Sequence, residues 1–104
     1  MEEEEYKLVF TKTFDKYFGK LPKNVQRMVI KDVEMLKQNP KVGKPLSLIK
    51  RHRKQIRVWS LKTGPRDSYR VLYQIDKKEK EIYLMVVMHR DQVYEWLKRW
   101  SRTL

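Results

Sequence analysis

The apolar residues of this chain recur with two different periods, which divide it into short helical and β-type segments. Residues 6–10 alternate weakly between apolar and polar positions and predict a short first strand. Apolar residues at helical spacing then predict a first helix over 11–19 and a second over 22–38. Pro22 is suited to the start of the second helix, and Asn39-Pro40 ends it. We therefore expect two antiparallel helices in a hairpin.

The second half of the chain has the alternation of an antiparallel sheet. Residues 41–55 contain glycine, proline and many cations, and we expect a loop there, at most with a brief helical turn. Three β-type runs follow at 56–61, 69–75 and 81–88, joined by links short enough for hairpins. Asp91 is placed to cap a last helix, with Val93, Trp96, Leu97 and Trp100 on its buried side. The predicted fold class is α+β: a helical hairpin packed on a small antiparallel sheet, with a C-terminal helix.

Alternation also predicts which side chains the helical hairpin covers. Tyr69, Val71, Tyr73 and Ile75 form the apolar set of the middle run, so Arg70, Leu72 and Gln74 point to the other face. Lys62 and Arg70 can then project from the same face across one hairpin. Both sets of the last run are apolar, which predicts a central strand covered on both faces. Periodicity does not decide which face His89 takes.

Length and composition limit the classes of protein that fit. A chain of 104 residues is expected to form one domain, residues 1–104, with an acidic tail over residues 1–5. Its lack of cysteine gives no sign of an oxidising compartment. No segment has the roughly 20 consecutive apolar residues of a membrane helix, and the acidic start is the reverse of a secretory signal. We expect a cytoplasmic protein that makes no membrane contact.

The charge distribution indicates a polyanionic partner. The chain has 25 Lys and Arg against 13 Asp and Glu, a formal net charge of +12. Residues 44–70 contain nine of the cations and one acid, Asp67. Such a one-sided excess attracts polyanions and releases their counterions, whereas a thermophilic origin would explain abundant charge of both signs. The candidate RNA-binding residues in this region are Arg51, Arg53, Lys54, Arg57 and Lys62.

Arg70 is the first candidate for a functional side chain. A guanidinium offers a bidentate fork to phosphate and stays charged at any working pH. An arginine between two tyrosines in a β-type run is less expected than a β-branched residue. The alternative is a structural ion pair with Asp67 or Asp76, and the sequence leaves it open.

His89, Arg90 and Tyr94 form the second group of candidates. A histidine suits proton transfer near neutrality, although one at a strand end can equally be structural. Tyr94 can stack on a base or use its hydroxyl, and its alternative is packing in the first turn of the last helix. Arg90 and Lys62 gain interest if they converge with Arg70. The two histidines lack metal-ligand spacing and the glycines form no phosphate loop, so we expect neither a metal nor a cofactor.

In their order and spacing these segments resemble the RelE/ParE superfamily of type II toxins. The resemblance covers residues 6 to about 96 and rests on the following segments: Tyr6-Lys7-Leu8-Val9-Phe10, Leu21-Pro22-Lys23, Asn39-Pro40, Gly43-Lys44-Pro45-Leu46, Arg57-Val58-Trp59-Ser60-Leu61, Tyr69-Arg70-Val71-Leu72-Tyr73, His89-Arg90 and Val93-Tyr94. It implies two helices on an antiparallel sheet, which agrees with the fold predicted above, and a cognate acidic antitoxin as partner.

The RelE branch of that superfamily cleaves messenger RNA in the ribosomal A site without a metal. The 2′-hydroxyl attacks the adjacent phosphate and leaves a cyclic phosphate end. By resemblance Arg70 and Arg90 match the arginines of that branch, Tyr94 its C-terminal tyrosine, and Lys62 a basic position at the first hairpin. His89 is similar to a histidine that acts as acid or base in some branches.

Two departures from the RelE pattern keep other functions open. The paired lysines of RelE correspond best to Val58 and Ser60, and the spacing from Arg90 to Tyr94 is shorter. The resemblance therefore implies either cleavage that rests on His89 and Tyr94 or a weakened or absent activity. The ParE branch shares the fold and inhibits DNA gyrase. A catalytically silent module that binds RNA or the ribosome is the third alternative.

Overall fold

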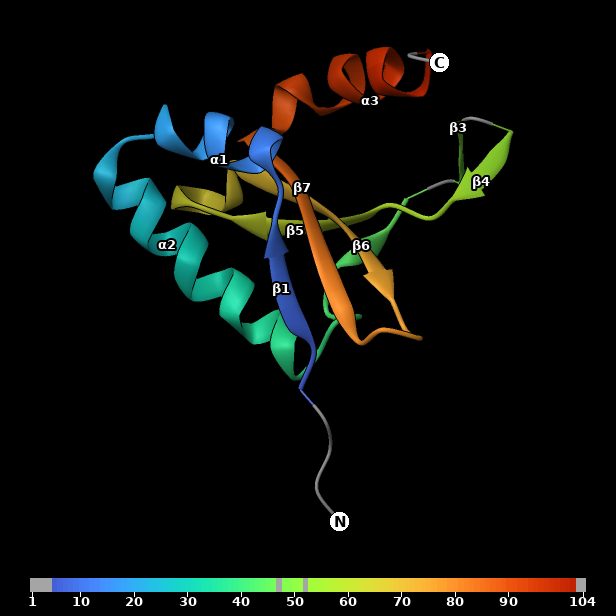
Figure 1. Ribbon diagram of the computed structural model, residues 1–104. Coiled ribbons are helices and arrows are strands. Elements are labelled where there is room, and N and C mark those ends of the chain that lie inside the picture. The colour runs from blue at the N-terminus through green and yellow to red at the C-terminus, as the bar shows by residue number, and fades with distance from the viewer. Residues whose placement is uncertain (1–4, 47, 52, 103–104) are drawn as a thin grey trace.

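The computed structural model describes residues 5–46, 48–51 and 53–102, and Figure 1 shows how its helices and strands are arranged. In chain order they are β1 (Lys7–Phe10), α1 (Lys12–Gly19), α2 (Lys23–Glu34), η1 (Met35–Lys37), β2 (Lys44–Pro45), β3 (Ile49–Arg51), β4 (Lys54–Ile56), β5 (Trp59–Thr63), η2 (Pro65–Asp67), β6 (Tyr69–Asp76), β7 (Glu81–His89), η3 (Arg90–Gln92) and α3 (Val93–Arg102).

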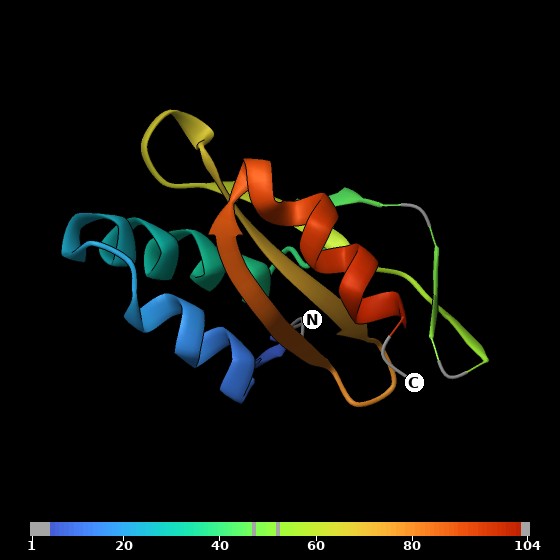
Figure 2. The ribbon, with the colours of Figure 1, turned by 90° about the horizontal axis from the view of Figure 1, so that it is seen from above.

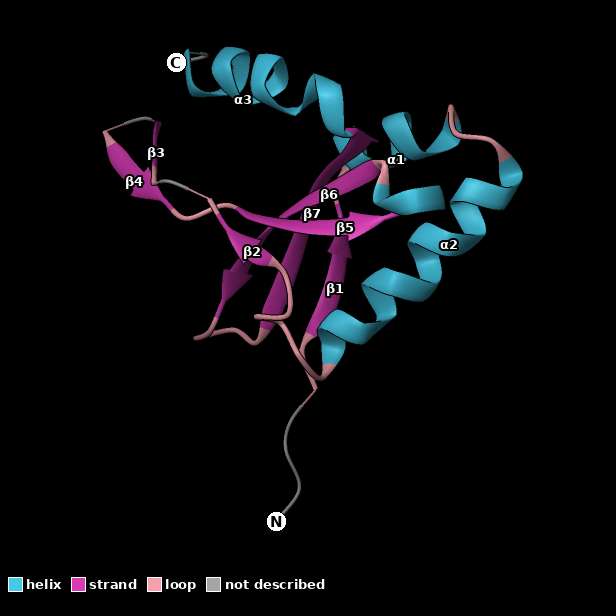
Figure 3. Ribbon diagram, turned by 180° about the vertical axis from the view of Figure 1, so that it is seen from behind, coloured by secondary structure: helices cyan, strands magenta, loops and turns pink. Residues whose placement is uncertain are grey.

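The main sheet has the strand order β1-β7-β6-β5-β2 (Figure 3). Strands β5, β6 and β7 form the antiparallel meander that the sequence predicts. Strand β1 joins β7 in parallel, from Lys7 opposite Glu81 to Phe10 opposite Leu84. A parallel first strand was outside the prediction, which covered only the meander. As expected, β7 is a central strand.

Helices cover the two faces of this sheet from opposite sides (Figure 2). The α1–α2 hairpin lies on one face, which we call the hairpin face, and α3 crosses the other, which we call the α3 face. The core on the hairpin face contains Phe14, Val25, Val29, Val33, Leu36, Leu61, Val71, Tyr73, Ile82, Leu84 and Val87. The core on the α3 face contains Val58, Leu72, Met85, Val86, Met88 and Leu97, with Val93, Trp96 and Trp100 packed against it. The fold class and the predicted faces of β5 and β6 are therefore confirmed.

The predicted alternation of β7 is wrong in its second half. Its register against β6 slips at Leu72/Tyr73, where Leu72 lies opposite Val86 and Tyr73 opposite Leu84. Met85 is the extra residue of a β-bulge, and Met85 and Val86 both pack on the α3 face. Strict alternation with a period of two predicted that Val86 and Met88 lie on the same face as Ile82 and Leu84. The bulge instead places Val86 and Met88 on the opposite face.

Thr11 joins the start of α1 to this bulge. Its hydroxyl donates to the Leu84 carbonyl oxygen at 2.8 Å, and the Met85 carbonyl oxygen lies 3.2 Å away. The hydroxyl oxygen of Thr11 also accepts the Phe14 backbone N–H at 3.1 Å and so caps α1. One side chain therefore fixes the helical hairpin to the irregular part of the central strand.

The loop predicted over residues 41–55 is also wrong. Residues Ile49–Arg51 and Lys54–Ile56 pair as an antiparallel hairpin, β3–β4, with Ile49 opposite Ile56. Both isoleucines pack against the core of the α3 face, while Lys50 and Lys54 are exposed. Each strand is only three residues long, too short for alternation to be visible in the sequence. The run predicted over 56–61 is consequently divided, with Ile56 in β4 and β5 starting at Trp59.

The cap predicted at Asp91 belongs instead to His89. The imidazole Nδ1 of His89 accepts the Asp91 backbone N–H at 3.2 Å and caps the short helix η3. Helix α3 continues from η3 at Val93. A histidine cap is not recognisable in the sequence, because Ser, Thr, Asp and Asn are the usual residues at this position.

The hydroxyl of Tyr73 holds the segment that leads into β2. It donates to the Pro40 carbonyl oxygen at 2.8 Å and accepts the Gly43 backbone N–H at 3.1 Å. Tyr73 is fully buried. Burial raises the pKa of Tyr73 to about 12, and the Gly43 N–H acts in the opposite direction. The folded protein therefore favours the neutral form of Tyr73.

Replacing Gly43 by alanine is expected to destabilise the protein. A Cβ at this position would lie 2.5 Å from the Tyr73 hydroxyl and 2.8 Å from the Ser60 carbonyl oxygen. We predict that Gly43→Ala lowers the free energy of unfolding in urea by about 1–3 kcal/mol. Gly19→Ala is the matched control, because nothing lies within 4 Å of its added Cβ. Equal unfolding free energies for the two variants would contradict this packing.

The raised pKa of Tyr73 predicts how stability changes at high pH. Between about pH 10 and pH 12 the folded tyrosine keeps its proton while the unfolded one loses it, so the free energy of unfolding falls as pH rises. The advantage of the native chain over Tyr73→Phe should therefore shrink across this range, by up to about 1.4 kcal/mol per pH unit. Tyr94→Phe, at a residue 87% exposed, is the control and should show no such trend. An advantage over Tyr73→Phe that stays constant from pH 8 to pH 12 would disprove it.

Candidate nucleic-acid interface

Most of the predicted site residues lie at one end of the main sheet. At this end β5 finishes, β6 begins and β7 finishes, so that Thr63, Tyr69 and His89 lie side by side across the three strands. We call the four cations around this end the basic rim; they are Lys62, Arg66, Arg70 and Arg90.

Lys62 and Arg70 lie directly opposite each other on β5 and β6, as alternation predicts. Arg70 lies opposite Met88 of β7, which belongs to the α3 face. Lys62 is exposed and Arg70 is half-buried. Two cations at adjacent positions of one face form a surface suited to a phosphate.

The guanidinium of Arg70 is held by carbonyl groups. Its Nη1 donates to the carbonyl oxygens of Asp67 and Tyr69, the latter at 3.0 Å. Among the described residues no carboxylate lies within ion-pair distance of Arg70. The predicted alternative of a pairing with Asp67 or Asp76 is therefore not observed. Neutral acceptors fix the side chain and leave its positive charge uncompensated.

The turn between β5 and β6 has an unusual backbone. Gly64, Arg66 and Asp67 have φ values of 79°, 55° and 55°, all in the region that side chains other than glycine seldom adopt. Such conformations persist where the surroundings impose them, and they concentrate at functional sites. The sequence showed only the turn signal Gly64-Pro65. The sequence alone therefore does not predict that Arg66 belongs to the basic rim.

A hydrogen bond joins this turn to the end of β7. The backbone N–H of Arg90 donates to the Ser68 carbonyl oxygen at 2.9 Å. Ser68 also donates its hydroxyl to the Pro65 carbonyl oxygen at 2.6 Å. These bonds hold exposed Arg90 beside the turn that carries Arg66.

His89 lies at the same end of the sheet but on the opposite face from Arg70. It is paired with Tyr69, and the two rings meet edge to face with centroids 5.5 Å apart. Tyr69 packs against the core of the hairpin face. Arg70 and His89 thus lie at one end of the sheet but on opposite faces.

The hydrogen bond of His89 selects a tautomer. Because Nδ1 accepts the Asp91 N–H, the neutral imidazole carries its proton on Nε2. In this form Nε2 is a hydrogen-bond donor. The Asp91 carboxylate lies 3.4 Å from Nδ1, where it can pair with the imidazolium form.

Tyr94 is 87% exposed on the first turn of α3, so the alternative of ordinary packing is not observed. An exposed aromatic ring beside η3 presents a face on which a base can stack.

The predicted RNA-binding cations of the 51–57 region belong to the β3–β4 hairpin and its exit. Arg53, Lys54 and Arg57 are exposed. Arg53 is at the hairpin turn with φ 64°, and Arg57 donates to the Leu46 carbonyl oxygen at 3.1 Å. Arg51 ends β3. His52 lies outside the described residues.

Val58 and Ser60, the positions that the resemblance matches to the paired lysines of RelE, are buried. Val58 is fully buried in the core of the α3 face, and Ser60 is 9% exposed. These two positions therefore supply packing.

Comparisons with known proteins identify the class of protein to which this fold belongs. A sequence model described as the ParE toxin of the type II toxin-antitoxin system parDE matches residues 8–94. The chain therefore belongs to the RelE/ParE family of type II toxins. No curated protein sequence matches it.

Solved structures of toxins share the fold. A chain of the RelBE2 toxin-antitoxin complex of Mycobacterium tuberculosis is 31% identical, with a TM-score of 0.66 over 83% of this chain and 99% of that one. A mutant of the Escherichia coli toxin RelE in the free state is 19% identical, with a TM-score of 0.71 over 96% and 99%. A chain of the archaeal RelE-RelB complex of Pyrococcus horikoshii is 20% identical, with a TM-score of 0.61 over 83% and 96%. Within the described residues, the helices are too short or too polar to cross a membrane.

The tautomer of His89 is directly measurable. We predict that long-range ¹⁵N–¹H spectra above the titration range show the Nε2–H form, with Nδ1 unprotonated. Asp91→Ala should leave this tautomer unchanged, because the donor to Nδ1 is the backbone N–H. His52→Gln assigns the second histidine. A dominant Nδ1–H form of His89 would contradict the cap.

Proposed function

We propose that the chain is a ribosome-dependent endonuclease that cleaves messenger RNA in the ribosomal A site and thereby inhibits translation in the cytoplasm. The observation that carries this proposal is the uncompensated charge of Arg70, fixed by two carbonyl oxygens directly opposite Lys62. The membership of the RelE/ParE family and the match to RelE folds support it.

In the proposed reaction the scissile phosphate binds at the basic rim. Arg70 and Lys62 contact its non-bridging oxygens from the α3 face, and Arg90 approaches from the end of β7. The 2′-hydroxyl oxygen attacks phosphorus and releases its proton to solvent, while the bond from phosphorus to the 5′-oxygen breaks. The cations stabilise the doubly charged phosphorane, whose charge exceeds that of the ground state.

In this proposal His89 is the proton donor, and the ring of Tyr94 is the surface on which a nucleobase stacks. In its imidazolium form, with which the Asp91 carboxylate 3.4 Å from Nδ1 can pair, His89 donates the Nε2 proton to the departing 5′-oxygen and is left neutral. Its position on the hairpin face then puts donor and cations on two sides of a phosphate bound across the sheet end. Tyr94 stacks on the neighbouring base. The products are a 2′,3′-cyclic phosphate and a 5′-hydroxyl.

A cognate acidic antitoxin is the proposed protein partner. The M. tuberculosis and P. horikoshii relatives were solved as toxin-antitoxin complexes. A formal net charge of +12 favours an acidic segment over the basic rim and the β3–β4 hairpin.

Gyrase inhibition is the second candidate function, because the matching family description is that of a ParE toxin. The buried Val58 and Ser60, at the positions of the RelE lysines, also favour it. A catalytically silent RNA- or ribosome-binding module would use the same cations without chemistry.

Primer extension on mRNA from induced cells separates these functions. We predict codon-positioned cuts that fall by about 10²-fold or more with Arg70→Ala, the usual cost of removing one donor to a developing anion. Lys31→Ala, which removes an exposed cation of α2, is the control and should keep full cutting. Intact mRNA with gyrase-linked DNA breaks would establish the ParE-type function instead. Growth arrest with neither product would establish the silent binder.

A further inference from the structure

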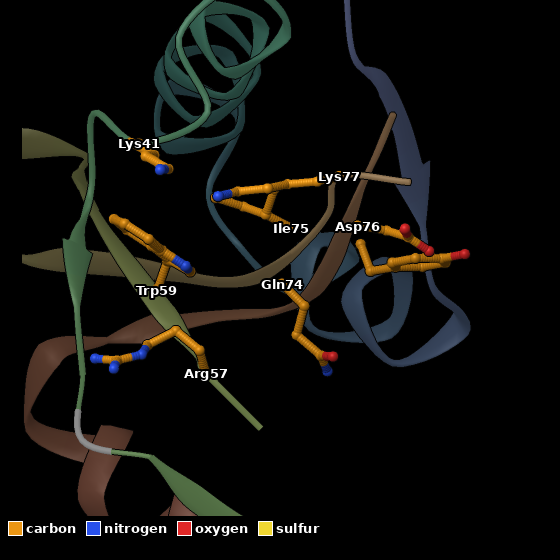
Figure 4. Close-up of a pocket in the computed structure, with 8 residues that line it drawn as sticks. Lys41, Arg57, Trp59, Gln74, Ile75, Asp76 and Lys77 are labelled. Atoms are coloured by element: carbon orange, nitrogen blue, oxygen red, sulfur yellow. The ribbon is translucent and has the colours of Figure 1, made fainter. Parts of the chain in front are cut away.

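A groove of about 580 Å³ lies at the end of the sheet opposite the basic rim (Figure 4). Its lining comes from the segment before β2, the start of β5, the end of β6, the β6–β7 turn and β7; the residues are Lys41, Arg57, Trp59, Gln74, Ile75, Asp76, Lys77 and Tyr83. Ile75 follows Arg70 by five positions on β6, which corresponds to about 17 Å along an extended strand. The groove is therefore a separate place on the surface.

The groove exists because β5 is shorter than β6 at this end. Pairing between the two strands stops at Trp59 opposite Tyr73, while β6 continues to Asp76. The chain before Trp59 turns away toward β4. In the described part of the chain, β6 beyond Tyr73 thus has a partner strand on its β7 side only.

An aromatic wall and a pair of like charges face each other across this gap. Trp59 is half-buried, and one side of its indole stacks on Tyr73 with centroids 6.3 Å apart. Lys41 and Lys77 point toward one another above the indole (Figure 4). The proximity of the two lysines affects the pKa of Lys77: hydrogen bonding and charge repulsion from Lys41 lower it.

Asp76 is the acidic residue among those that line the groove, and its carboxylate points away from Lys41 and Lys77 (Figure 4). Asp76 accepts the Glu79 backbone N–H at 3.0 Å, within the β6–β7 turn. Glu81 accepts the hydroxyl of Tyr83 at 2.6 Å. Arg57 adds a third cation, exposed at the edge of the groove. An anion placed between the two lysines would relieve their repulsion.

We propose that this groove binds an unpaired nucleotide of single-stranded RNA, with its base on Trp59 and its phosphate between Lys41 and Lys77. An aromatic platform beside cations is the usual combination in proteins that bind single strands, because every base has a face to stack and every nucleotide a phosphate. The choice of RNA as the single strand rests on the proposed function. The groove serves as a binding subsite remote from the cleavage site at the basic rim.

The test is an NMR titration of the ¹⁵N-labelled chain with a 2′-O-methyl RNA trinucleotide. The blocked 2′-hydroxyl prevents cleavage, so the titration reports binding alone. The indole N–H of Trp59 should shift more than those of Trp96 and Trp100. Its titration curve gives the dissociation constant of the groove separately from any binding at the basic rim.

Two double variants decide whether the lysines take part. Lys41→Ala/Lys77→Ala should raise this dissociation constant at least about 10-fold, equivalent to about 1.4 kcal/mol. It should also lower the slope of log affinity against log salt by about 0.7, the value for one single-strand phosphate contact. Lys16→Ala/Lys31→Ala removes the same charge from exposed positions of α1 and α2 and should have a much smaller effect. Equal effects of the two double variants would overturn the proposal.

The remaining outcomes separate this proposal from others. An unmoved Trp59 signal, or the same lysine dependence with inorganic phosphate and no indole shift, would remove the stacking site. Binding of a poly-glutamate peptide in place of the trinucleotide would make the groove a protein-docking surface and overturn the proposal. Arg70→Ala should bind the trinucleotide at Trp59 as the native chain does. Uncut mRNA with intact trinucleotide binding would therefore refute the nuclease function and support the groove.

Discussion

The double burial of β7 is the constraint on which the rest of this structure depends. The strand lies between parallel β1 and antiparallel β6, and both of its faces are covered by core. The bulge at Met85 changes the face of every residue that follows it, and the Thr11 hydroxyl binds the carbonyl oxygens on either side of that change. As a result Met88 lies beside Arg70 on the α3 face, and His89 lies beside Tyr69 on the hairpin face. A single inserted residue thus sets the arrangement of the candidate site.

The sequence predicted the parts of the fold that depend on long, regular patterns. Helical spacing located the α1–α2 hairpin, and alternation put Lys62 opposite Arg70 because the β5–β6 hairpin is regular. It failed where one local contact overrides a period. The bulge, the three-residue strands of the β3–β4 hairpin and the imidazole cap at His89 leave no periodic trace. The turn at Arg66 and Asp67 was hidden for a similar reason, since positive φ is imposed there by the surroundings on residues that seldom adopt it.

The charge of the chain is organised around the two ends of its central strands. At one end carbonyl oxygens hold Arg70 and leave its charge available, next to Lys62 and Arg90. At the other end Lys41 and Lys77 repel each other above an indole ring. Each arrangement presents positive charge to which an anion can bind. The neutral hydroxyl of Tyr73 is hydrogen-bonded to Pro40 and Gly43, on either side of Lys41. The buried tyrosine therefore holds in place the segment that brings Lys41 close to Lys77.

The most direct test of the central claim is the chemistry of the RNA ends made by the purified chain on ribosomes programmed with a defined mRNA. The account predicts cuts in the A-site codon that carry a 2′,3′-cyclic phosphate on one fragment and a 5′-hydroxyl on the other, because the nucleophile is the RNA's own hydroxyl. It also predicts that these ends require Arg70. Intact mRNA, or ends with a 3′-hydroxyl and a 5′-phosphate, would contradict the assignment of the basic rim as a site of RNA cleavage.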